Sequence, residues 1–437
     1  MKRILGLLLM LIVLVKLDGQ TLYYPPATVS ATWETKSPES LGWKMNYVDS
    51  LYRFLEGENT KAFIVLKDGK IVLEKYFGSF TADSVWYWAS AGKTLTSFLV
   101  GKAAEDGFLS INDLTSKYLG VGWTSCTLAQ ESKITIRHQL TMTSGLDDGV
   151  VDNHCTSRSC LQYKADAGTR WAYHNAPYTL LESVIEKACS QNINLYTQSK
   201  LKAKTGMTGL WFMSGDDNVF FSTARSMARF GLLAQDHFKW NGEPLLVDTA
   251  YVRALTSTSQ SLNLSYGYLW WLNGKSSYML PTMQFVFQGS YASSAPADMF
   301  AGLGKNGQIV SVSPSQGLVV VRMGNQPGSP AADIAPQLCN QIWDRLQLAT
   351  GATTDVHPGG FVSERVEGKM LANGTGFELN FAGMCDRVVV FDMKAQPQIV
   401  MLSQQSGCKI DISGLTRGVY IVRLKFGDYF KTLRFVK

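Results

Sequence analysis

The stretch WYWASAGKTLTSFLVG, residues 86–101, sets Ser90 and Lys93 three positions apart at the start of an apolar run of helical length. On an α-helix, positions i and i+3 lie on the same face, so the Lys93 amine can reach the Ser90 hydroxyl. The apolar residues on both sides predict burial, which lowers the pKa of a lysine and lets it act as a base. The pair therefore predicts a nucleophilic serine beside its own base.

The Ser-x-x-Lys spacing alone is weak evidence for a catalytic pair, because the same pattern recurs elsewhere in the chain at Ser199-Lys202 and Ser406-Lys409. A second element, Tyr173-His174-Asn175, stands just before an amphipathic helical pattern. We expect Tyr173 to relay a proton and Asn175 to hydrogen-bond substrate or Lys93. The alternative is an ordinary half-buried tyrosine followed by an asparagine at a helix N-cap.

A third element should be a positive charge beside a glycine at a strand edge, where backbone N–H groups can bind a substrate carbonyl oxygen. Two segments compete for this part. Lys204-Thr205-Gly206 leads into no clean hairpin, and we interpret it as a turn that ends a helix. Lys305-Asn306-Gly307 opens a β-hairpin pattern immediately before an amphipathic stretch, so we choose Lys305.

Strand patterns lie on both sides of these motifs. Residues 61–78, KAFIVLKDGKIVLEKYFG, contain two β-rich runs around an Asp-Gly turn, which is typical of a hairpin. Residues 300–325 hold two more β runs around a Pro-Ser-Gln-Gly turn, and residues 331–348 are amphipathic. Helical patterns and polar loops fill residues 90–229. The order predicts an α+β fold, in which N- and C-terminal segments build one antiparallel sheet, flanked by helices, with a helical subdomain between them.

The two ends of the chain differ from this main unit. A short basic start and twelve apolar residues, 4–15, predict a signal peptide over residues 1–19. Twelve apolar residues are too few to span a bilayer, and a buried N-terminal helix is disfavoured because no polar face exists. We expect residues 20–350 to form the main domain and residues 351–360 a linker. Short alternating β runs in residues 361–437 predict a small all-β sandwich.

Composition and residue spacing argue against several other classes of protein. The formal charge of +6 is scattered, without a basic block that would indicate nucleic-acid binding. The histidines and cysteines lack metal-ligand spacing, so we expect no metal and no organic cofactor. No Gly-x-Ser-x-Gly motif occurs, which argues against an α/β-hydrolase. An exported chain can form disulfides, and the expected pairs are Cys155 with Cys160 and Cys385 with Cys408.

The three motifs, in this order, resemble those of the serine β-lactamase and penicillin-binding superfamily. Residues 134–148, ITIRHQLTMTSGLDD, and residues 295–324 also resemble the branch that holds class C β-lactamases, D-aminoacyl peptidases, esterases and the 6-aminohexanoate-dimer hydrolase. The resemblance covers roughly residues 40–348. It implies the β-lactamase/transpeptidase-like fold and a serine hydrolase, which the predicted signal peptide would export.

The resemblance also implies roles for individual residues. Ser90 would be acylated, while Lys93 and Tyr173 would share general-base and general-acid work. The N–H groups of Ser90 and Gln308 would form the oxyanion hole, and Lys305 would supply positive potential. The substrate- and oxyanion-binding residues implied in this way are Asn175, Lys305, Gly307 and Gln308.

One position departs from the pattern. Asn306 stands where β-lactamases and peptidases usually carry Thr or Ser to hold a substrate carboxylate. We therefore expect a small-molecule ester, or an amide or peptide without that carboxylate. A β-lactamase or D-aminoacyl or DD-peptidase is the first alternative. A penicillin-binding sensor that acylates without turnover and a non-catalytic surface-binding protein are the others.

The tail KIDISGLTRGVYIVRLKFGDYFKTLRFVK, residues 409–437, resembles the C-terminal sorting domain of type IX secretion cargo. Its Gly-x-Tyr-x-x-Arg run, a turn and a short basic last strand carry the likeness. The resemblance implies a Gram-negative host, export through the periplasm to the cell surface or medium, and the secretion machinery as partner of residues 361–437. A generic accessory sandwich is the alternative.

Overall fold

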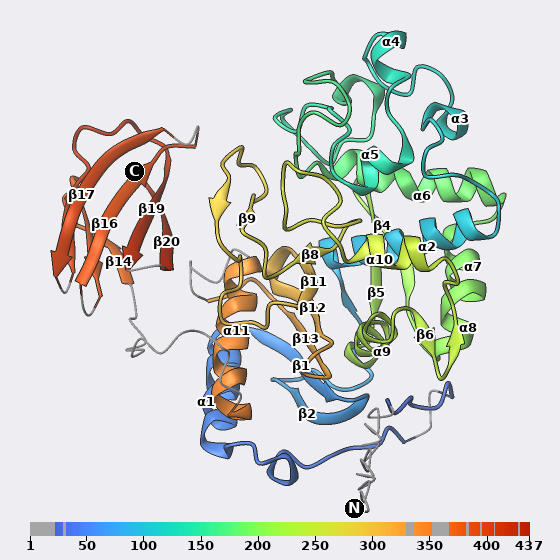
Figure 1. The fold of residues 1–437 in the computed structure, drawn as a ribbon, viewed down its shortest axis with the longest axis horizontal. Helices are drawn as coiled ribbons and strands as arrows, with labels where there is room; N and C mark the ends of the chain where they lie inside the picture. Colours follow the sequence, from blue (N-terminus) through green and yellow to red (C-terminus); the bar gives the residue numbers. More distant parts are fainter. Residues whose placement is uncertain are drawn as a thin grey trace, which may run out of the picture.

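The computed structural model describes residues 22–28, 32–328, 335–351, 367–381, 384–393, 396–405, 407–426 and 429–437 (Figure 1). The predicted signal peptide, residues 1–19, lies outside the described residues, as does all but the first residue of the predicted linker, 351–360. In the part of the chain that is described, no helix combines the length and apolar character needed to cross a bilayer.

A six-stranded antiparallel sheet joins the two ends of the main domain, in the order β2-β1-β13-β12-β11-β8. Its strands are β1 (Thr60–Lys67), β2 (Lys70–Tyr76), β8 (Trp271–Leu272), β11 (Phe300–Gly304), β12 (Gln308–Ser313) and β13 (Leu318–Gly324). β1 pairs with β13, so the N-terminal hairpin is hydrogen-bonded to the C-terminal one. The α+β prediction is thus confirmed.

The two central strands β12 and β13 are buried along their whole length, because helices cover both faces of the sheet. Helices α1 (Met45–Gly57) and α11 (Ala335–Thr350) pack together on one face, and α9 (Ala224–Gln235) lies on the other (Figure 1). α9 approaches closely at Gly231, where an added Cβ would lie 2.4 Å from Val319. Trp343 of α11 donates to Ser311 from the opposite face.

The chain between β2 and β8 forms the helical subdomain and two small sheets. Besides α9, its larger helices are α2 (Lys93–Glu105), α6 (Asn175–Cys189) and α10 (Thr249–Leu255). Short helices and turns are η2 (Ala89–Gly92), α3 (Ser116–Leu119), α4 (Leu128–Glu131), α5 (Ile136–Leu140), η3 (Arg158–Cys160), α7 (Ile193–Thr197), η4 (Gln198–Lys202) and α8 (Ala203–Thr205). Gly206, with φ 70°, ends α8, so the interpretation of Lys204-Thr205-Gly206 as a helix-ending turn is confirmed.

The small sheets were not expected from the sequence. One has the order β3-β5-β4, from β3 (Trp86–Tyr87), β4 (Leu210–Ser214) and β5 (Asp217–Ser222). The remaining short elements of the main domain are η1 (Glu39–Leu41), β6 (Lys239–Trp240), β7 (Glu243–Pro244), β9 (Ser277–Tyr278), β10 (Phe287–Gln288) and η5 (Lys305–Gly307). The sheet β3-β5-β4 matters for function, because β3 leads directly into the turn that carries Ser90.

The C-terminal region is all-β, as predicted. Two sheets, β14-β15-β18 and β17-β16-β19-β20, enclose one hydrophobic cluster that includes Phe377, Val390 and Val422. The strands are β14 (Glu367–Met370), β15 (Gly376–Asn380), β16 (Met384–Phe391), β17 (Pro397–Gln405), β18 (Cys408–Asp411), β19 (Val419–Phe426) and β20 (Tyr429–Val436).

Of the two expected disulfides, one is present. Cys155 and Cys160 are bonded across a short loop. The predicted pair of Cys385 and Cys408 is wrong, since no disulfide joins them. These two cysteines lie on β16 and β18, which belong to different sheets, and the Cys385 thiol donates to the carbonyl of Arg387.

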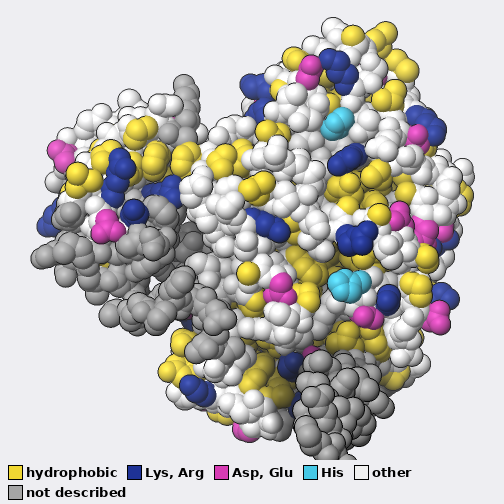
Figure 2. Space-filling model, in the orientation of Figure 1, with side chains coloured by type: hydrophobic (Ala, Val, Ile, Leu, Met, Phe, Trp, Pro, Cys, Tyr) yellow, Lys and Arg dark blue, Asp and Glu magenta, His cyan; other side chains and the backbone are white. Residues whose placement is uncertain are grey.

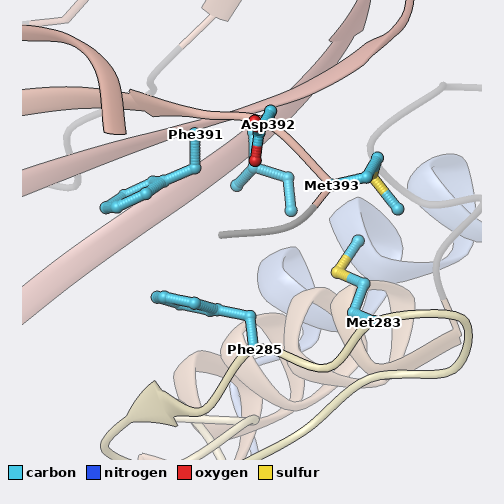
Figure 3. A pocket seen from close by; sticks show the side chains of 6 residues that line it. Met283, Phe285, Phe391, Asp392 and Met393 are labelled. Atoms are coloured by element: carbon cyan, nitrogen blue, oxygen red, sulfur yellow. The ribbon is translucent and has the colours of Figure 1, made fainter. Parts of the chain in front are cut away.

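The sandwich contacts the main domain through an apolar loop between β9 and β10. A pocket there is lined by Met283, Phe285, Phe391, Asp392, Met393 and Ile421 (Figure 3). The rings of Phe285 and Phe391 lie 5.3 Å apart between centroids. On the face drawn in Figure 2, basic and acidic side chains are interspersed rather than gathered into one charged patch.

Candidate active site

A one-turn helix, η2, holds Ser90 between the short strand β3 and helix α2. The sequence predicted a helix beginning at Ser90, whereas α2 itself begins at Lys93. Ala89 adopts a left-handed conformation with φ 48°, which turns the chain sharply before the serine. The turn is anchored by Trp88, whose fully buried indole donates to Ser222 on β5. Ser90 is thus held on a fixed turn beside the small sheet.

Lys93 lies at the centre of the site. Its Nζ donates to Ser90 Oγ at 2.9 Å and to Asn175 Oδ1 at 2.8 Å. The side chain is 2% exposed, and Nζ lies 4.0 Å from the ring centre of Tyr178 and 5.0 Å from that of Tyr173. The three elements η2, α2 and α6 therefore meet at this amine.

Burial lowers the pKa of Lys93 to about 7, although the neighbouring Asp217 and Glu182 act in the opposite direction. Desolvation disfavours the ammonium form, because a charge loses its hydration when it is buried. Near neutral pH a large share of this lysine is then an uncharged amine. Such an amine, in hydrogen-bond contact with a hydroxyl, can accept its proton.

Tyr173 reaches Ser90 from the other side. It is 8% exposed, and its ring stacks on that of Trp271 with 6.0 Å between the ring centres. Burial raises its pKa well above the ordinary value, although the nearby Ser90 hydroxyl acts in the opposite direction. The group is therefore a neutral phenol, which can pass a proton but does not carry a standing negative charge.

Asn175 is the first residue of α6, and the N-cap is His174. The interpretation of Asn175 as an N-cap is therefore wrong. Its Oδ1 faces Lys93, while its Nδ2 donates to Asn153 Oδ1 at 3.1 Å and lies 3.2 Å from His154 Nε2. The sequence pattern identified Asn175 but missed both partners, which come from the disulfide loop.

The strand edge beside Ser90 is formed by the end of β11. A Cβ added to Gly304 would lie 3.1 Å from the Ser90 nitrogen and 2.6 Å from the Trp88 carbonyl oxygen. Only a glycine permits this approach, because any side chain would meet the backbone of the serine turn. Gln308, predicted for the oxyanion hole, is the residue paired with Gly304 across the sheet. Its amide side chain is bonded to both backbone groups of Gly324, so it supports this edge.

The predicted Lys305-Asn306-Gly307 segment is the turn between β11 and β12. Lys305 is exposed, and its side chain makes no hydrogen bond or ion pair with a described residue. Asn306 Nδ2 donates to the hydroxyl of Tyr87 at 2.7 Å. Buried Arg322 donates to the carbonyl oxygens of Asn306 and Gly307 at 2.9 and 2.7 Å. Arg322 thus fixes the conformation of this turn. The sequence did not predict this role for Arg322.

Within the described parts of the chain, no cluster of three or more His, Cys, Asp or Glu residues is arranged to hold a metal ion.

Comparison with known proteins places this geometry in context. A protein of Alkalihalophilus pseudofirmus without an assigned function is 26% identical over 305 residues, which cover 61% of this chain and 84% of the relative. A Salmonella paratyphi A protein, provisionally named a D-alanyl-D-alanine carboxypeptidase, is 21% identical over 67% of this chain and 83% of its own.

Among solved structures, a Bacillus anthracis protein provisionally named a 6-aminohexanoate-dimer hydrolase has a TM-score of 0.56 at 16% identity, covering 75% of this chain and 90% of that chain. This likeness shows a common fold. The family model described as Beta-lactamase matches residues 56–338, which include every motif of the site. The chain therefore belongs to the beta-lactamase family.

Proposed function

We propose that this protein is a serine hydrolase that cleaves an ester or amide bond through an acyl-enzyme on Ser90. The observation that carries the proposal is the 2.9 Å contact between Ser90 Oγ and a buried Lys93 whose pKa is lowered to about 7. Members of the beta-lactamase family are serine hydrolases, which supports the same conclusion.

The reaction follows from the protonation states of the groups. Neutral Lys93 takes the hydroxyl proton as Ser90 Oγ attacks the substrate carbonyl carbon. We expect the Ser90 N–H and the adjoining edge of β11 to bind the developing oxyanion. As the tetrahedral intermediate collapses, the leaving alcohol or amine receives a proton through Tyr173. A water molecule, deprotonated by the same pair, then hydrolyses the acyl ester, which releases the acid and restores Ser90.

The turn after β11 bears on the substrate. Asn306 uses its amide to bond Tyr87, and a carboxamide offers no hydroxyl for a substrate carboxylate. This supports an ester, or an amide without a carboxylate at that position. The provisional name of the Salmonella paratyphi A relative favours a second candidate, a peptidase that acts on D-alanyl-D-alanine substrates.

A substrate panel separates these candidates. The protein is incubated with a p-nitrophenyl ester, the β-lactam nitrocefin and a D-Ala-D-Ala peptide, and initial rates are compared. The proposal predicts that ester turnover exceeds lactam and peptide turnover. Faster peptide cleavage would establish the second candidate, while stoichiometric acylation by nitrocefin without turnover of any substrate would indicate a penicillin-binding sensor.

We also propose that the chain is exported, with residues 361–437 acting as a type IX sorting domain. Support comes from the basic-apolar start of the sequence, residues 1–19, and from the motif in the tail. In a Gram-negative host with this secretion system, the full chain should reach the cell surface or medium. A chain ending at residue 360 should stay in the periplasm. The same distribution of both would contradict the sorting role.

A further inference from the structure

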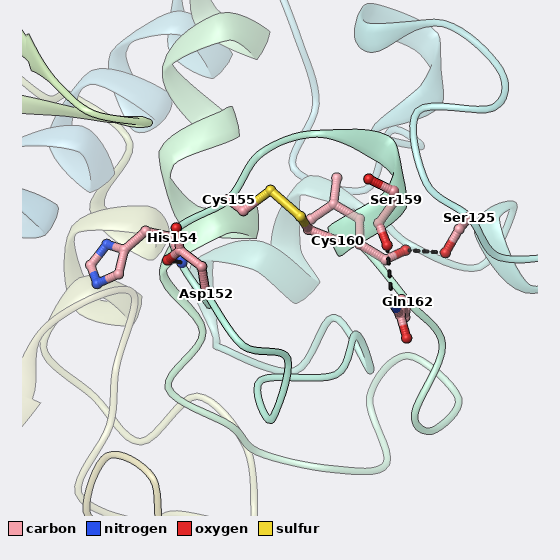
Figure 4. Close-up of a disulfide and its surroundings, with 8 residues drawn as sticks. Ser125, Asp152, His154, Cys155, Ser159, Cys160 and Gln162 are labelled. Carbon is pink, nitrogen blue, oxygen red and sulfur yellow. Dashed lines mark hydrogen bonds between the residues drawn. A yellow bond between two sulfur atoms is a disulfide. The ribbon is translucent and has the colours of Figure 1, made fainter.

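The loop that contains the Cys155–Cys160 disulfide places two polar side chains against the amide nitrogen of Asn175. Asn153 and His154 immediately precede Cys155, which is bonded to Cys160 (Figure 4). The His154 backbone N–H donates to Asp152 Oδ1 at 2.9 Å, so the loop is folded tightly before the bridge. In Figure 4 the His154 ring points away from the disulfide. It extends toward Asn175 and Asp217, each of which it contacts.

The hydrogen bonds of the Asn175 amide determine which ring nitrogen of His154 carries the proton. An amide nitrogen only donates, so His154 Nε2, 3.2 Å from Asn175 Nδ2, must accept. The imidazole proton then lies on Nδ1, where it donates to Asp217 Oδ2 at 2.5 Å. With both amide hydrogens directed at Asn153 and His154, the Asn175 oxygen is turned toward Lys93.

Asp217 completes the chain of contacts. It accepts from Thr179 of α6 at 3.0 Å as well as from His154. Burial acts to raise the pKa of Asp217, but its hydrogen bond with His154, together with other contacts that include the one with Thr179, outweighs this effect and lowers the pKa. The ionised carboxylate holds the neutral imidazole in one tautomer, as carboxylates beside histidines commonly do.

We propose that His154, held by Asp217, is a positioning residue that fixes the side-chain amide of Asn175 and so keeps its oxygen on the Lys93 amine. This inference rests on the proposed function, because it gives Lys93 the part of base toward Ser90. His154 forms no hydrogen bond with Ser90 or Lys93, and its side chain is 48% exposed. A histidine that served only the fold would leave the chemistry unchanged when replaced.

The consequence is measurable in the pH profile of the reaction. When the Asn175 amide is free to rotate, the ammonium form of Lys93 loses its carbonyl acceptor, which lowers the pKa of the lysine. Loss of the Asp217 charge has the same sign, because that charge raises the pKa. The ionisable and aromatic groups that face Lys93 are Asp217 from β5, Glu182 and Tyr178 from α6, and Tyr173.

The experiment compares four variants of the full chain in ester hydrolysis. His154→Leu removes the acceptor, and His154→Gln restores it, because a glutamine can accept from Asn175 and donate to Asp217. Asp217→Asn removes the charge. Lys164→Leu is the matched control, since it breaks an exposed ion pair with Asp147 in the same loop.

We expect His154→Leu to lower kcat/KM about five- to tenfold, the size of one lost hydrogen bond, and to move the acid limb of the profile to lower pH. His154→Gln should recover most of the loss, Asp217→Asn should shift the limb in the same direction, and Lys164→Leu should match the wild type. If Ser90 is acylated in the wild type but His154→Leu keeps its rate and its acid limb, the positioning role is overturned. If a fluorophosphonate fails to acylate Ser90 in the wild type, the proposed function fails instead.

Discussion

Two opposing effects set the charge on the Lys93 amine. Complete burial removes the hydration that an ammonium needs, while the carboxylate of Asp217 favours the charged form. Burial wins, and the pKa falls to about 7. In the proposed mechanism, the apolar sequence on both sides of Ser90 thus lets Lys93 act as a base near neutral pH.

The sign of the pH dependence follows. A base must be unprotonated, so kcat/KM should rise as the pH is raised through about 7 and then level off. Lys93→Arg keeps a positive charge at every accessible pH and should lower kcat/KM by about a thousandfold or more, with no rise near pH 7. Lys102→Arg, an ion-paired position on the same helix, is the control and should keep the wild-type profile. Initial rates of the wild type and both variants, measured at about ten pH values between 5 and 9, would test this prediction.

Contacts between individual residues could be predicted from the sequence only where the residues are close together in the chain. Ser90 and Lys93 meet because helical spacing alone brings them together, and Cys155 and Cys160 are bonded across a short loop. The contacts of Asn175 with Asn153 and His154 depend on the path of a loop, which no periodic pattern encodes. The list of site residues was therefore predictable in part, while the network behind it was not.

Among the elements, the contact between β11 and the serine turn η2 constrains the site most tightly. Gly304 has ordinary extended dihedral angles, φ −130° and ψ 161°, so it is required for space and not for an unusual backbone. Without a side chain, the strand can lie directly against Ser90. This edge, not the exposed side chain of Lys305, is the part of the turn region that touches the serine.

Gly304→Ala should therefore impair catalysis more than stability. The added methyl would meet backbone atoms of Trp88, Ser90 and Ala91, and it would push β11 away from the nucleophile. We expect kcat/KM to fall by at least about tenfold, because small displacements of reacting groups are costly. Gly57→Ala is the control, since an added Cβ there meets nothing within 4 Å. Equal activity of the two variants would show that the edge of β11 plays no part.

Some strands could be recognised from the sequence and others could not. The hairpins β1-β2 and β12-β13 were predicted, because long apolar runs flank recognisable turns. The sheet β3-β5-β4 was missed, since its strands are short and their exposed faces mix polar and apolar residues. Residues 266–274, YGYLWWLNG, are also rich in strand-forming residues, yet the only named strand among them is β8, which is two residues long.

In the part of the chain that the structure describes, the C-terminal sandwich contacts the main domain through a small apolar cluster. The loop that carries Phe285 also holds Gln284, whose side chain donates to the carbonyl of Trp171, two residues before Tyr173. The loop thus touches both the sandwich and the segment that carries a site residue. The sequence predicted the two units but gave no sign of their contact, because neither partner surface follows a regular pattern.

Phe285→Ser tests this contact in the full chain. The ring packs against Phe287 at 4.6 Å and Phe391 at 5.3 Å, so its loss removes the apolar area that joins the two units. The radius of gyration in solution scattering should increase relative to the wild type. Val286→Ser, at an exposed neighbouring position outside the pocket lining, should leave it unchanged. An unaltered radius in Phe285→Ser would mean that other contacts hold the units together.

The central claim is that Ser90 is the residue acylated, and covalent labelling tests it most directly. The full protein is treated with a fluorophosphonate at pH 8, and intact mass and peptide mapping locate the adduct. We predict one adduct per chain, on Ser90, and none in Ser90→Ala. An adduct on another residue, or ester turnover by Ser90→Ala at the wild-type rate, would contradict the account.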